Sequence, residues 1–292
     1  MSILSNIGEV DCVQVTPLLD DYCGFGSDFL AQHGISILID VFYENRHSKR
    51  ILLDTGNSAE IVLHNMELIN IDPKTIDMIF LSHCHYDHTG GLIEILKTIN
   101  KNIPVVAHPQ IFRQNYKLEP CLKNIGLKEN AREEVAKAGG HPVLIDKPFN
   151  LMPGVISTGE VERVTGFEGK GIGTYNIVNN EFVPDLIIDD MALIINIKKK
   201  GLLIVSGCSH SGIVNIVKHS IKITGIDKIH GIMGGLHLVN ASDEVIDKTV
   251  EELIKLNPEH VVAGHCTGLK ALAKLMTAFR DKFSQLSIGR NF

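Results

Sequence analysis

The sequence predicts an α/β fold in which two mixed sheets carry helices on their outer faces. Short runs rich in Ile and Val alternate with segments of helical periodicity, and the order strand, strand, helix occurs twice. Such an order is typical of two sheets that pack together and are covered by helices outside. A length of 292 residues is enough to bury a sizeable core. We therefore expect one domain spanning residues 1–292.

The first half is expected to form a sheet with two helices. Its apolar runs are bounded by polar turns, and residues 46–49 read as the turn between the second and third strands. The expected order is strand 10–17, strand 35–43, strand 51–53, helix 58–70, strand 78–82, helix 91–98 and strand 104–107. Residues 110–147 then combine many charges with apolar residues at helical spacing, which predicts a helical excursion or lid between the halves.

The second half repeats this plan. Lys198, Lys199 and Lys200 read as a solvated turn between two strands, and Ser242 followed by acidic residues is a favourable helix start. The expected elements are strands 154–157, 192–197 and 202–205, helix 212–223, strand 229–233, helix 242–256, strand 260–263 and a closing helix from residue 269.

Composition excludes several classes of protein. Twenty-eight Lys and Arg against 34 Asp and Glu give a net charge of −6, so the chain has no general attraction for nucleic acid, and a nuclease is disfavoured. No uncharged apolar run approaches the roughly 20 residues of a membrane span, and the first residues do not resemble a secretory signal. The six cysteines include no CxxC pair, which suits a reducing cytoplasm. We expect a cytoplasmic protein acting on a small molecule, as a monomer or a homo-oligomer.

A cluster of histidines follows the strand expected at 78–82. Side chains alternate along a strand, so His83 and His85 point to the same side and can reach one cation. Asp87 and His88 lie at the following bend, where they suit a second cation. Imidazole and carboxylate ligands together favour Zn, Mn or Fe over Ca or Mg. Surface or core histidines are the alternative, but the H-x-H-x-D-H spacing favours a metal site.

This segment resembles the signature of the metallo-β-lactamase superfamily, and the resemblance covers nearly the whole chain. It implies a four-layer αβ/βα sandwich and a site that binds one or two metal ions. His265, in Ala263-Gly264-His265-Cys266, is similar to the last histidine ligand of the family. Asp54, in Leu52-Leu53-Asp54-Thr55-Gly56, is similar to an early aspartate that supports the metal site.

Two positions depart from the common pattern of the superfamily. Cys208 stands where a metal-bridging aspartate is expected; a thiolate is a good zinc ligand, and a buried inert cysteine is the alternative. The usual third histidine is missing from its expected strand end. Glu160, close to that position, and His210, after Cys208, are the candidates to replace it.

Further histidines are candidates for the substrate pocket. His237 resembles, by its position before His265, a histidine that phosphodiesterase branches of the superfamily use near a substrate phosphate. His237 and His210 are therefore expected to protonate a leaving group or hold an anion. His33 and His108 follow loop or strand ends and are candidates for pocket or structural roles.

Several short motifs narrow the resemblance. Gly207-Cys208-Ser209-His210, Gly234-Gly235-Leu236-His237-Leu238 and Ala31-Gln32-His33-Gly34 occur together here. Their combination resembles the subgroup of 7,8-dihydropterin-6-methyl-4-(β-D-ribofuranosyl)aminobenzene-5′-phosphate synthases, which is associated with methanopterin synthesis.

The main expectation is a metal-dependent hydrolase, with zinc or else Mn or Fe, that attacks a small anionic ester or phosphorylated metabolite through a metal-bound hydroxide. Asp87 is expected to bind one ion and to orient this nucleophile. The alternatives are a pterin-related synthase, an iron enzyme that reduces or inserts oxygen, and a non-catalytic protein that binds metal or ligand.

Overall fold

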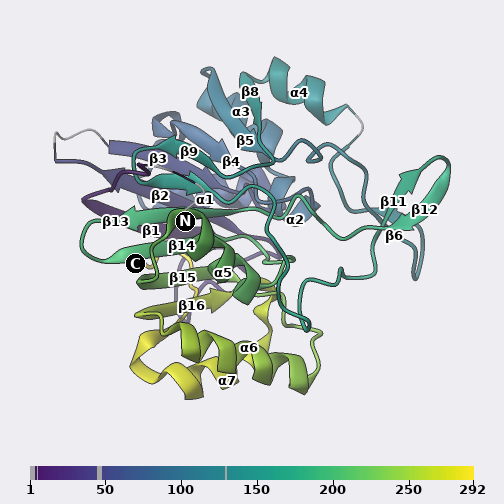
Figure 1. Ribbon diagram of the computed structural model, residues 1–292. Helices are drawn as coiled ribbons and strands as arrows, with labels where there is room; N and C mark the ends of the chain where they lie inside the picture. The colour runs from purple at the N-terminus through teal and green to yellow at the C-terminus, as the bar shows by residue number, and fades with distance from the viewer. Residues whose placement is uncertain (1–3, 5, 45–47, 129) are drawn as a thin grey trace.

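The computed structural model describes residues 4, 6–44, 48–128 and 130–292. Each half of the chain forms a sheet with helices on its outer face, and the two sheets stack to give four layers (Figure 1). The expected αβ/βα sandwich is therefore confirmed.

The first sheet has the order β1-β2-β3-β4-β5-β8. The pairs β1–β2 and β2–β3 are antiparallel, and the remaining neighbours are parallel. Its strands are β1 (Cys12–Leu19), β2 (Ser36–Phe42), β3 (Ser48–Leu53), β4 (Met78–Phe80), β5 (Ile103–Ala107) and β8 (Gly140–Leu144). Ser48 and Lys49, expected in a turn, already belong to β3, whereas residues 46 and 47 lie outside the described part of the chain.

Helices α1 (Ala59–Leu68) and α3 (Leu92–Ile99) cover this sheet, and a 3₁₀ turn at Pro73–Thr75 precedes β4. In α3, Leu92, Ile95, Leu96 and Ile99 are buried, and their spacing places them on one face of the helix. Asn100 ends α3 in the left-handed conformation, which asparagine adopts more easily than most residues.

The second sheet has the order β17-β16-β15-β14-β13-β10-β9. Strands β14 to β17 are mutually parallel, and β13 and β10 continue the sheet in antiparallel pairing. Its strands are β9 (Phe149–Met152), β10 (Val155–Ser157), β13 (Ala192–Ile197), β14 (Gly201–Ser206), β15 (Ile229–Gly235), β16 (His260–Gly264) and β17 (Phe283–Gln285). The helices are α5 (Ile213–Thr224), α6 (Asp243–Leu256) and α7 (Leu269–Phe279), with 3₁₀ turns at His265–Thr267 and Arg280–Lys282.

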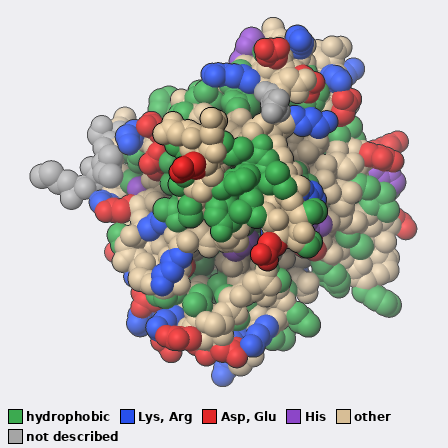
Figure 2. All heavy atoms as spheres, turned by 90° about the vertical axis from the view of Figure 1, so that its right-hand side faces the viewer, with side chains coloured by type: hydrophobic (Ala, Val, Ile, Leu, Met, Phe, Trp, Pro, Cys, Tyr) green, Lys and Arg blue, Asp and Glu red, His purple; other side chains and the backbone are tan. Residues whose placement is uncertain are grey.

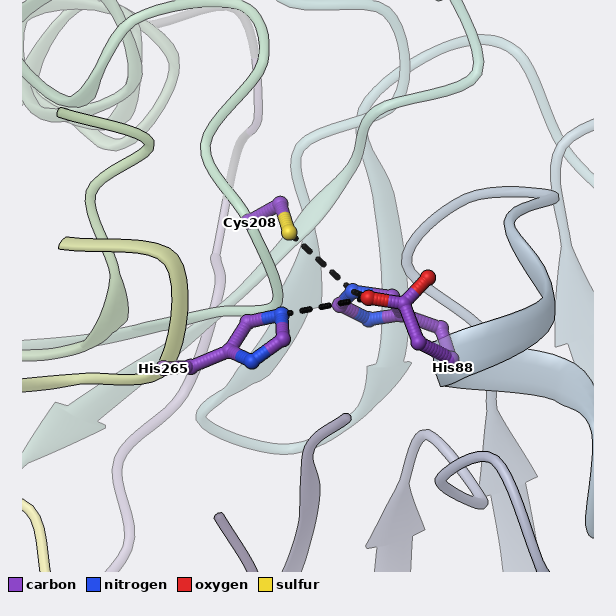
Figure 3. A group of neighbouring side chains, drawn as sticks. His88, Cys208 and His265 are labelled. Carbon is purple, nitrogen blue, oxygen red and sulfur yellow. Dashed lines mark hydrogen bonds and ion pairs between the residues drawn. The ribbon is translucent and has the colours of Figure 1, made fainter. Parts of the chain in front are cut away.

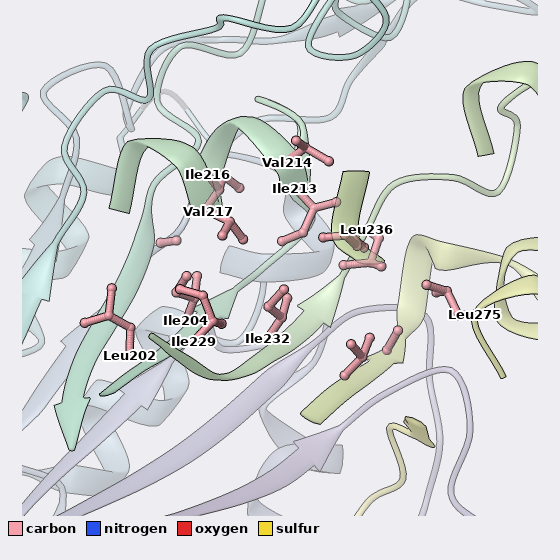
Figure 4. Packing of buried hydrophobic residues seen from close by; sticks show 14 of the residues in the cluster. Leu202, Ile204, Ile213, Val214, Ile216, Val217, Ile229, Ile232, Leu236 and Leu275 are labelled. Carbon is pink, nitrogen blue, oxygen red and sulfur yellow. The ribbon is translucent and has the colours of Figure 1, made fainter. Parts of the chain in front are cut away.

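Three apolar clusters hold the layers together. One lies between the first sheet and its helices, one between the two sheets, and one between the second sheet and α5 to α7. Figure 4 shows the last of these, where Ile213 and Val217 of α5 pack over Ile204 and Ile232 of the sheet. Because these side chains are almost wholly aliphatic, burial of hydrocarbon area provides the main driving force for stacking.

The expectation of a helical segment at 110–147 was wrong for most of its length. The described part of this segment has a single helix, α4 (Ala131–Lys137), and its last strand, β8, completes the first sheet. Two short strands, β6 (Tyr116–Lys117) and β7 (Lys123–Asn124), pair with the hairpin β11 (Tyr175–Val178) and β12 (Glu181–Pro184). The helical periodicity holds only over α4, where Ala131 and Val135 are buried, and it misled elsewhere because β6 and β8 pair with strands outside the segment.

The small sheet β12-β11-β6-β7 projects from the body of the molecule (Figure 1). Figure 2 shows hydrophobic side chains gathered on the face of the molecule that carries it, and Ile177, Val178, Phe182 and Val183 of the hairpin are exposed. Among the described helices, none has the length and apolar character that a membrane crossing requires.

Candidate metal centre

The candidate ligands all follow the carboxyl ends of strands in the two sheets. The signature segment leaves β4 and continues into the short helix α2 (Tyr86–Thr89), which carries Asp87 and His88. Cys208 and His210 follow β14, and His265 follows β16. The two sheets therefore each bring a loop to the same edge of the sandwich. Gly90 and Gly91 are required here, because a Cβ atom at either would collide with the backbone of residues 55–57.

Three imidazoles form the first cluster. The Nε2 atom of His83 lies 3.0 Å from Nδ1 of His85 and 3.1 Å from Nε2 of His210. All three rings are buried. Burial and the neighbouring imidazoles hold the pKa of His83 and His210 well below the usual value, so these rings are neutral, as a metal ligand must be.

The second cluster combines a carboxylate, two imidazoles and a thiol. Nε2 of His88 lies 3.1 Å from the Sγ atom of Cys208 and 3.6 Å from Oδ2 of Asp87, which is 3.4 Å from Nε2 of His265 (Figure 3). The candidate ligand atoms of these four residues lie within 4.8 Å of one another. Burial raises the pKa of the Cys208 thiol, and a bound cation would favour the thiolate.

An unsatisfied histidine tests whether these residues fit a metal ion. His265 is buried, yet neither of its ring nitrogens makes a hydrogen bond to the described residues. Its ring nitrogens lie near carboxylate oxygens, of Asp87 at 3.4 Å from Nε2 and of Asp21 at 3.7 Å from Nδ1. A buried imidazole without hydrogen bonds costs free energy, and coordination to a cation would remove that cost. Imidazole and thiolate ligands suit zinc and other transition ions better than Mg or Ca. The residues present therefore fit the metal that the sequence implies.

Asp54 and Ser82 contact the candidate histidine ligands and fix the orientation of their rings. Oδ2 of Asp54 accepts a hydrogen bond from Nδ1 of His88 at 2.6 Å, which leaves Nε2 of that ring free to bind. The backbone amide of Ser82 donates to Asp54 at 2.8 Å, and the hydroxyl oxygen of Ser82 lies 2.9 Å from Nδ1 of His83. Asp54 thus contacts a candidate ligand directly.

The remaining sequence candidates occupy different places. The ring of His237 contacts that of His210 at a tilt, with centroids 4.2 Å apart, and its ligand atoms also lie near Cys208. His33 is half-exposed at the edge of the site, with Nε2 at 3.4 Å from Oδ2 of Asp87. His108 and Glu160 instead contact each other at 3.1 Å, and neither belongs to a described cluster of candidate ligands. The Glu160 side chain is partly exposed and pairs with His108, so the structure brings His210, and not Glu160, beside His83.

Sequence reasoning missed several residues that shape the site. Asn115 contacts Nε2 of His85 through Oδ1 at 3.2 Å. Asp189 accepts a hydrogen bond from the amide of Cys84, and Asp190 accepts one from the amide of Ser211, each at 2.8 Å. Two consecutive aspartates directly before the buried strand β13 were a signal, because buried carboxylates need hydrogen-bond donors. The sequence around Asn115 contains no comparable signal.

A small pocket adjoins the metal centre. Its volume is about 140 Å³, and its walls include His210, His237 and the glycine-rich segment Gly169-Lys170-Gly171. Lys170 is exposed and makes no ion pair with the described residues. The pocket therefore offers one cation and two imidazoles to a ligand that reaches the ions.

The four-layer sandwich and the histidine clusters at its edge are the features of the metallo-beta-lactamase fold, and the chain belongs to the metallo-beta-lactamase superfamily. Residues 35–173 match the model of that superfamily. The chain is 47% identical, over 292 residues and 99% of both chains, to the 7,8-dihydropterin-6-methyl-4-(beta-D-ribofuranosyl)-aminobenzene-5′-phosphate synthase of Methanocaldococcus jannaschii. It is also 36% identical to an uncharacterized protein of that organism over 85% of this chain and 88% of the other.

Among solved structures, Tm1679, described as a metal-dependent hydrolase of the beta-lactamase superfamily, is similar with a TM-score of 0.80 and 27% identity. That match covers 96% of this chain and 98% of the other.

Proposed function

We propose that the protein is a metal-dependent synthase that joins a dihydropterin to a phosphorylated aminobenzene riboside. The observation that carries this proposal is the 47% identity with the M. jannaschii synthase over 99% of both chains. The candidate metal clusters support it, because they lie beside a pocket that contains Lys170 and His237.

The proposed step forms a carbon–nitrogen bond. The amine nitrogen of the aminobenzene attacks the 6-methylene carbon of a dihydropterin, and the bond from that carbon to an anionic leaving group breaks with its electron pair. The proton of the amine passes to a base, for which His237 is placed in the pocket wall. When bound, divalent ions supply Lewis acidity that neutralises negative charge on the leaving group.

Each residue of the site has a proposed part in this reaction. We assign His83, His85 and His210 to one ion, and Asp87, His88, Cys208 and His265 to the other. Zinc fits these ligands, with Mn or Fe as alternatives. Lys170 would hold an anionic group of the substrate, because it is the cation in the wall of the adjoining pocket.

Hydrolysis of a small anionic metabolite is the second candidate. It is supported by the similarity to Tm1679, whose description is a metal-dependent hydrolase. The same ligands and the same pocket would serve, with water in place of the amine as nucleophile. A non-catalytic protein that only binds metal and ligand is the third.

One experiment separates the three. Zinc-loaded protein is incubated with a 7,8-dihydropterin that carries a diphosphate on its 6-methyl carbon, with and without 4-(β-D-ribofuranosyl)aminobenzene 5′-phosphate. Mass spectrometry then follows the coupled product and the released diphosphate. Coupled product supports the synthase, whereas diphosphate released equally without the amine supports the hydrolase.

The matched variants are H85A, at a candidate ligand, and H141A, at an exposed histidine of β8. H85A should lose bound zinc and product formation together, and H141A should keep both. Zinc-loaded wild-type protein that binds both compounds without forming product would refute the synthase and leave the binding protein.

A further inference from the structure

A second cavity lies between the two sheets at the end of the sandwich opposite the metal centre. Its volume is about 330 Å³, which is within the usual range for small-molecule sites. Its lining includes Val13 near the start of β1, Leu203 near the start of β14 and His260 at the start of β16. The candidate metal ligands follow the other ends of β14 and β16, so the cavity is separate from that site.

One position beside this cavity, in the inner face of the sheet, has no side chain. Leu203, Gly231 and His260 are aligned across the parallel strands β14, β15 and β16, so they face the same side. Gly231 adds no side chain to this row. Leu203 keeps 9% of its surface exposed and Val262, in the next row, keeps 6%, although both belong to the cluster between the sheets. The side chains that face the interior of the cavity from these rows are apolar, whereas charged and polar residues complete its lining.

Cationic groups surround the mouth of this cavity. Lys200, Lys282, His230 and His260 line it. The ammonium group of Lys282 donates to the side chain of Asn257 and to the carbonyl of Pro258, whereas the ammonium group of Lys200 makes no hydrogen bond or ion pair with any residue that the structure describes. Burial lowers the pKa of His260, and its neighbours His230, Lys200 and Lys282 lower it further, whereas the charge of Glu259 raises it. A negative charge is therefore favoured at this position.

The nearby carboxylates are already paired. Asp11 lines the cavity, and its carboxylate lies 3.1 Å from Nζ of Lys198, a residue outside the lining. Glu259 lies 2.7 Å from His230 and 3.2 Å from Nζ of Lys228. His230, Glu259 and His260 could hold a metal ion by distance alone, but the lysines beside them repel a cation. The charge at the mouth favours an anion.

We propose that this cavity binds a small amphipathic carboxylate, with its hydrocarbon chain between the sheets and its carboxylate at Lys200 and Lys282. The apolar walls favour hydrocarbon because its burial removes it from water. The two ammonium groups favour an anion at the mouth. A sugar phosphate lacks the apolar part, and a neutral hydrocarbon leaves Lys200 without a partner. This site is independent of the proposed synthase activity.

The cysteines of the chain provide a direct test. Cys12 is exposed and lines the cavity, whereas Cys121 is exposed and does not line it. Decanoate is added to the full-length protein, and alkylation of the two cysteines by iodoacetamide is followed by peptide mass spectrometry. Decanoate should slow alkylation of Cys12 several-fold and leave Cys121 unchanged. Zinc-loaded and chelator-treated protein should behave alike, because the cavity does not involve the metal centre.

Variants and a neutral analogue test the role of charge. Decanol should protect Cys12 only at a concentration roughly tenfold higher than decanoate. The double variant K200Q/K282Q should lower the affinity for decanoate by a similar factor, which corresponds to a loss of about 1.4 kcal/mol in binding free energy. K248Q, at an exposed lysine of α6, is the control. Circular dichroism and zinc content verify that the variants fold.

Three results would overturn the proposal. The first is no protection of Cys12 up to the solubility limit of decanoate. The second is protection that disappears when metal is removed, because the carboxylate would then bind at the metal centre. The third is equal protection by decanoate in wild type and K200Q/K282Q, because the lysines would then play no part.

Discussion

At the scale of single residues, the direction of each imidazole matters more than its presence. His88 binds Asp54 through Nδ1 and turns Nε2 toward Cys208. His85 contacts Asn115 through Nε2 and turns Nδ1 toward His83. A hydrogen bond on one ring nitrogen fixes which nitrogen is left for a metal. The residues behind the candidate ligands are therefore expected to control metal affinity.

We predict that D54N weakens zinc binding by roughly 10- to 100-fold, because the amide is a poorer acceptor for Nδ1 of His88. Competition with a chromophoric chelator measures the affinity. D227N, at an exposed aspartate before β15, is the control and should bind zinc like wild type. Equal affinities of D54N and wild type would show that Asp54 does not support the ligand.

At the scale of elements, the loops after the strands position the site. Gly207 follows β14, and a Cβ atom there would collide with Oγ of Ser82 and approach Oδ2 of Asp54. The absence of a side chain at this residue allows the two sheets to bring Cys208 and His88 together. Glu168 holds the segment after Cys208 in another way, because its carboxylate accepts hydrogen bonds from the backbone amides of Asn215 and Val214 at the start of α5.

We predict that G207A destabilises the fold by about 1–3 kcal/mol, as overpacking of a buried site does, and weakens zinc binding. The free energy of unfolding, from urea titration, and the zinc affinity are measured together. G166A is the matched control, because a Cβ atom at Gly166 meets no described atom within 4 Å. An unaffected G207A would mean that the loops shift freely around this residue.

We predict that the stability of the protein depends on pH through Glu168. Burial raises its pKa to about 7, above the ordinary value of 4.5, so the folded state binds more protons between these values. The contribution of this protonation to the free energy of unfolding is complete below pH 4.5 and is lost as the pH rises through about 7. The free energy of unfolding should therefore fall over this window more steeply in wild type than in E168Q, by roughly 1–3 kcal/mol. Parallel pH profiles of the two proteins would contradict this role.

At the scale of the whole molecule, the metal centre joins the two halves. His83, His85, Asp87 and His88 come from the first half, and Cys208, His210 and His265 from the second. The His83–His210 contact links residues 127 positions apart in the chain. An ion held by both halves would bind the folded state and not the unfolded chain.

Zinc should therefore stabilise the whole protein. With free zinc about 1,000-fold above its dissociation constant, the gain is about 4 kcal/mol, and removal by a chelator should lower the unfolding temperature. Calorimetry of loaded and chelator-treated protein measures the difference, and H85A should lose most of the gain. An identical unfolding temperature with and without zinc would exclude a metal that bridges the halves.

Local spacing in the sequence determined the elements and much of the candidate site. The H-x-H-x-D-H spacing after the strand expected at 78–82 predicted that His83, His85, Asp87 and His88 gather at one strand end. Strand β4 ends at Phe80, so His83 and His85 lie in the loop that follows it and not on an alternating strand. The strands and helices of both halves followed from their apolar periodicity in the same way. The segment 110–147 did not, because its strands form by pairing with distant partners.

Only the tertiary structure decided which distant residues meet. It brought His210 beside His83, Asn115 beside His85, and Asp189 beside Cys84 across 105 positions of the chain. It also opened a cavity beside Gly231 that no local pattern marks. Such contacts depend on how the two sheets stack, and that stacking is set by the packing of the whole apolar interior rather than by the spacing of residues within any one segment.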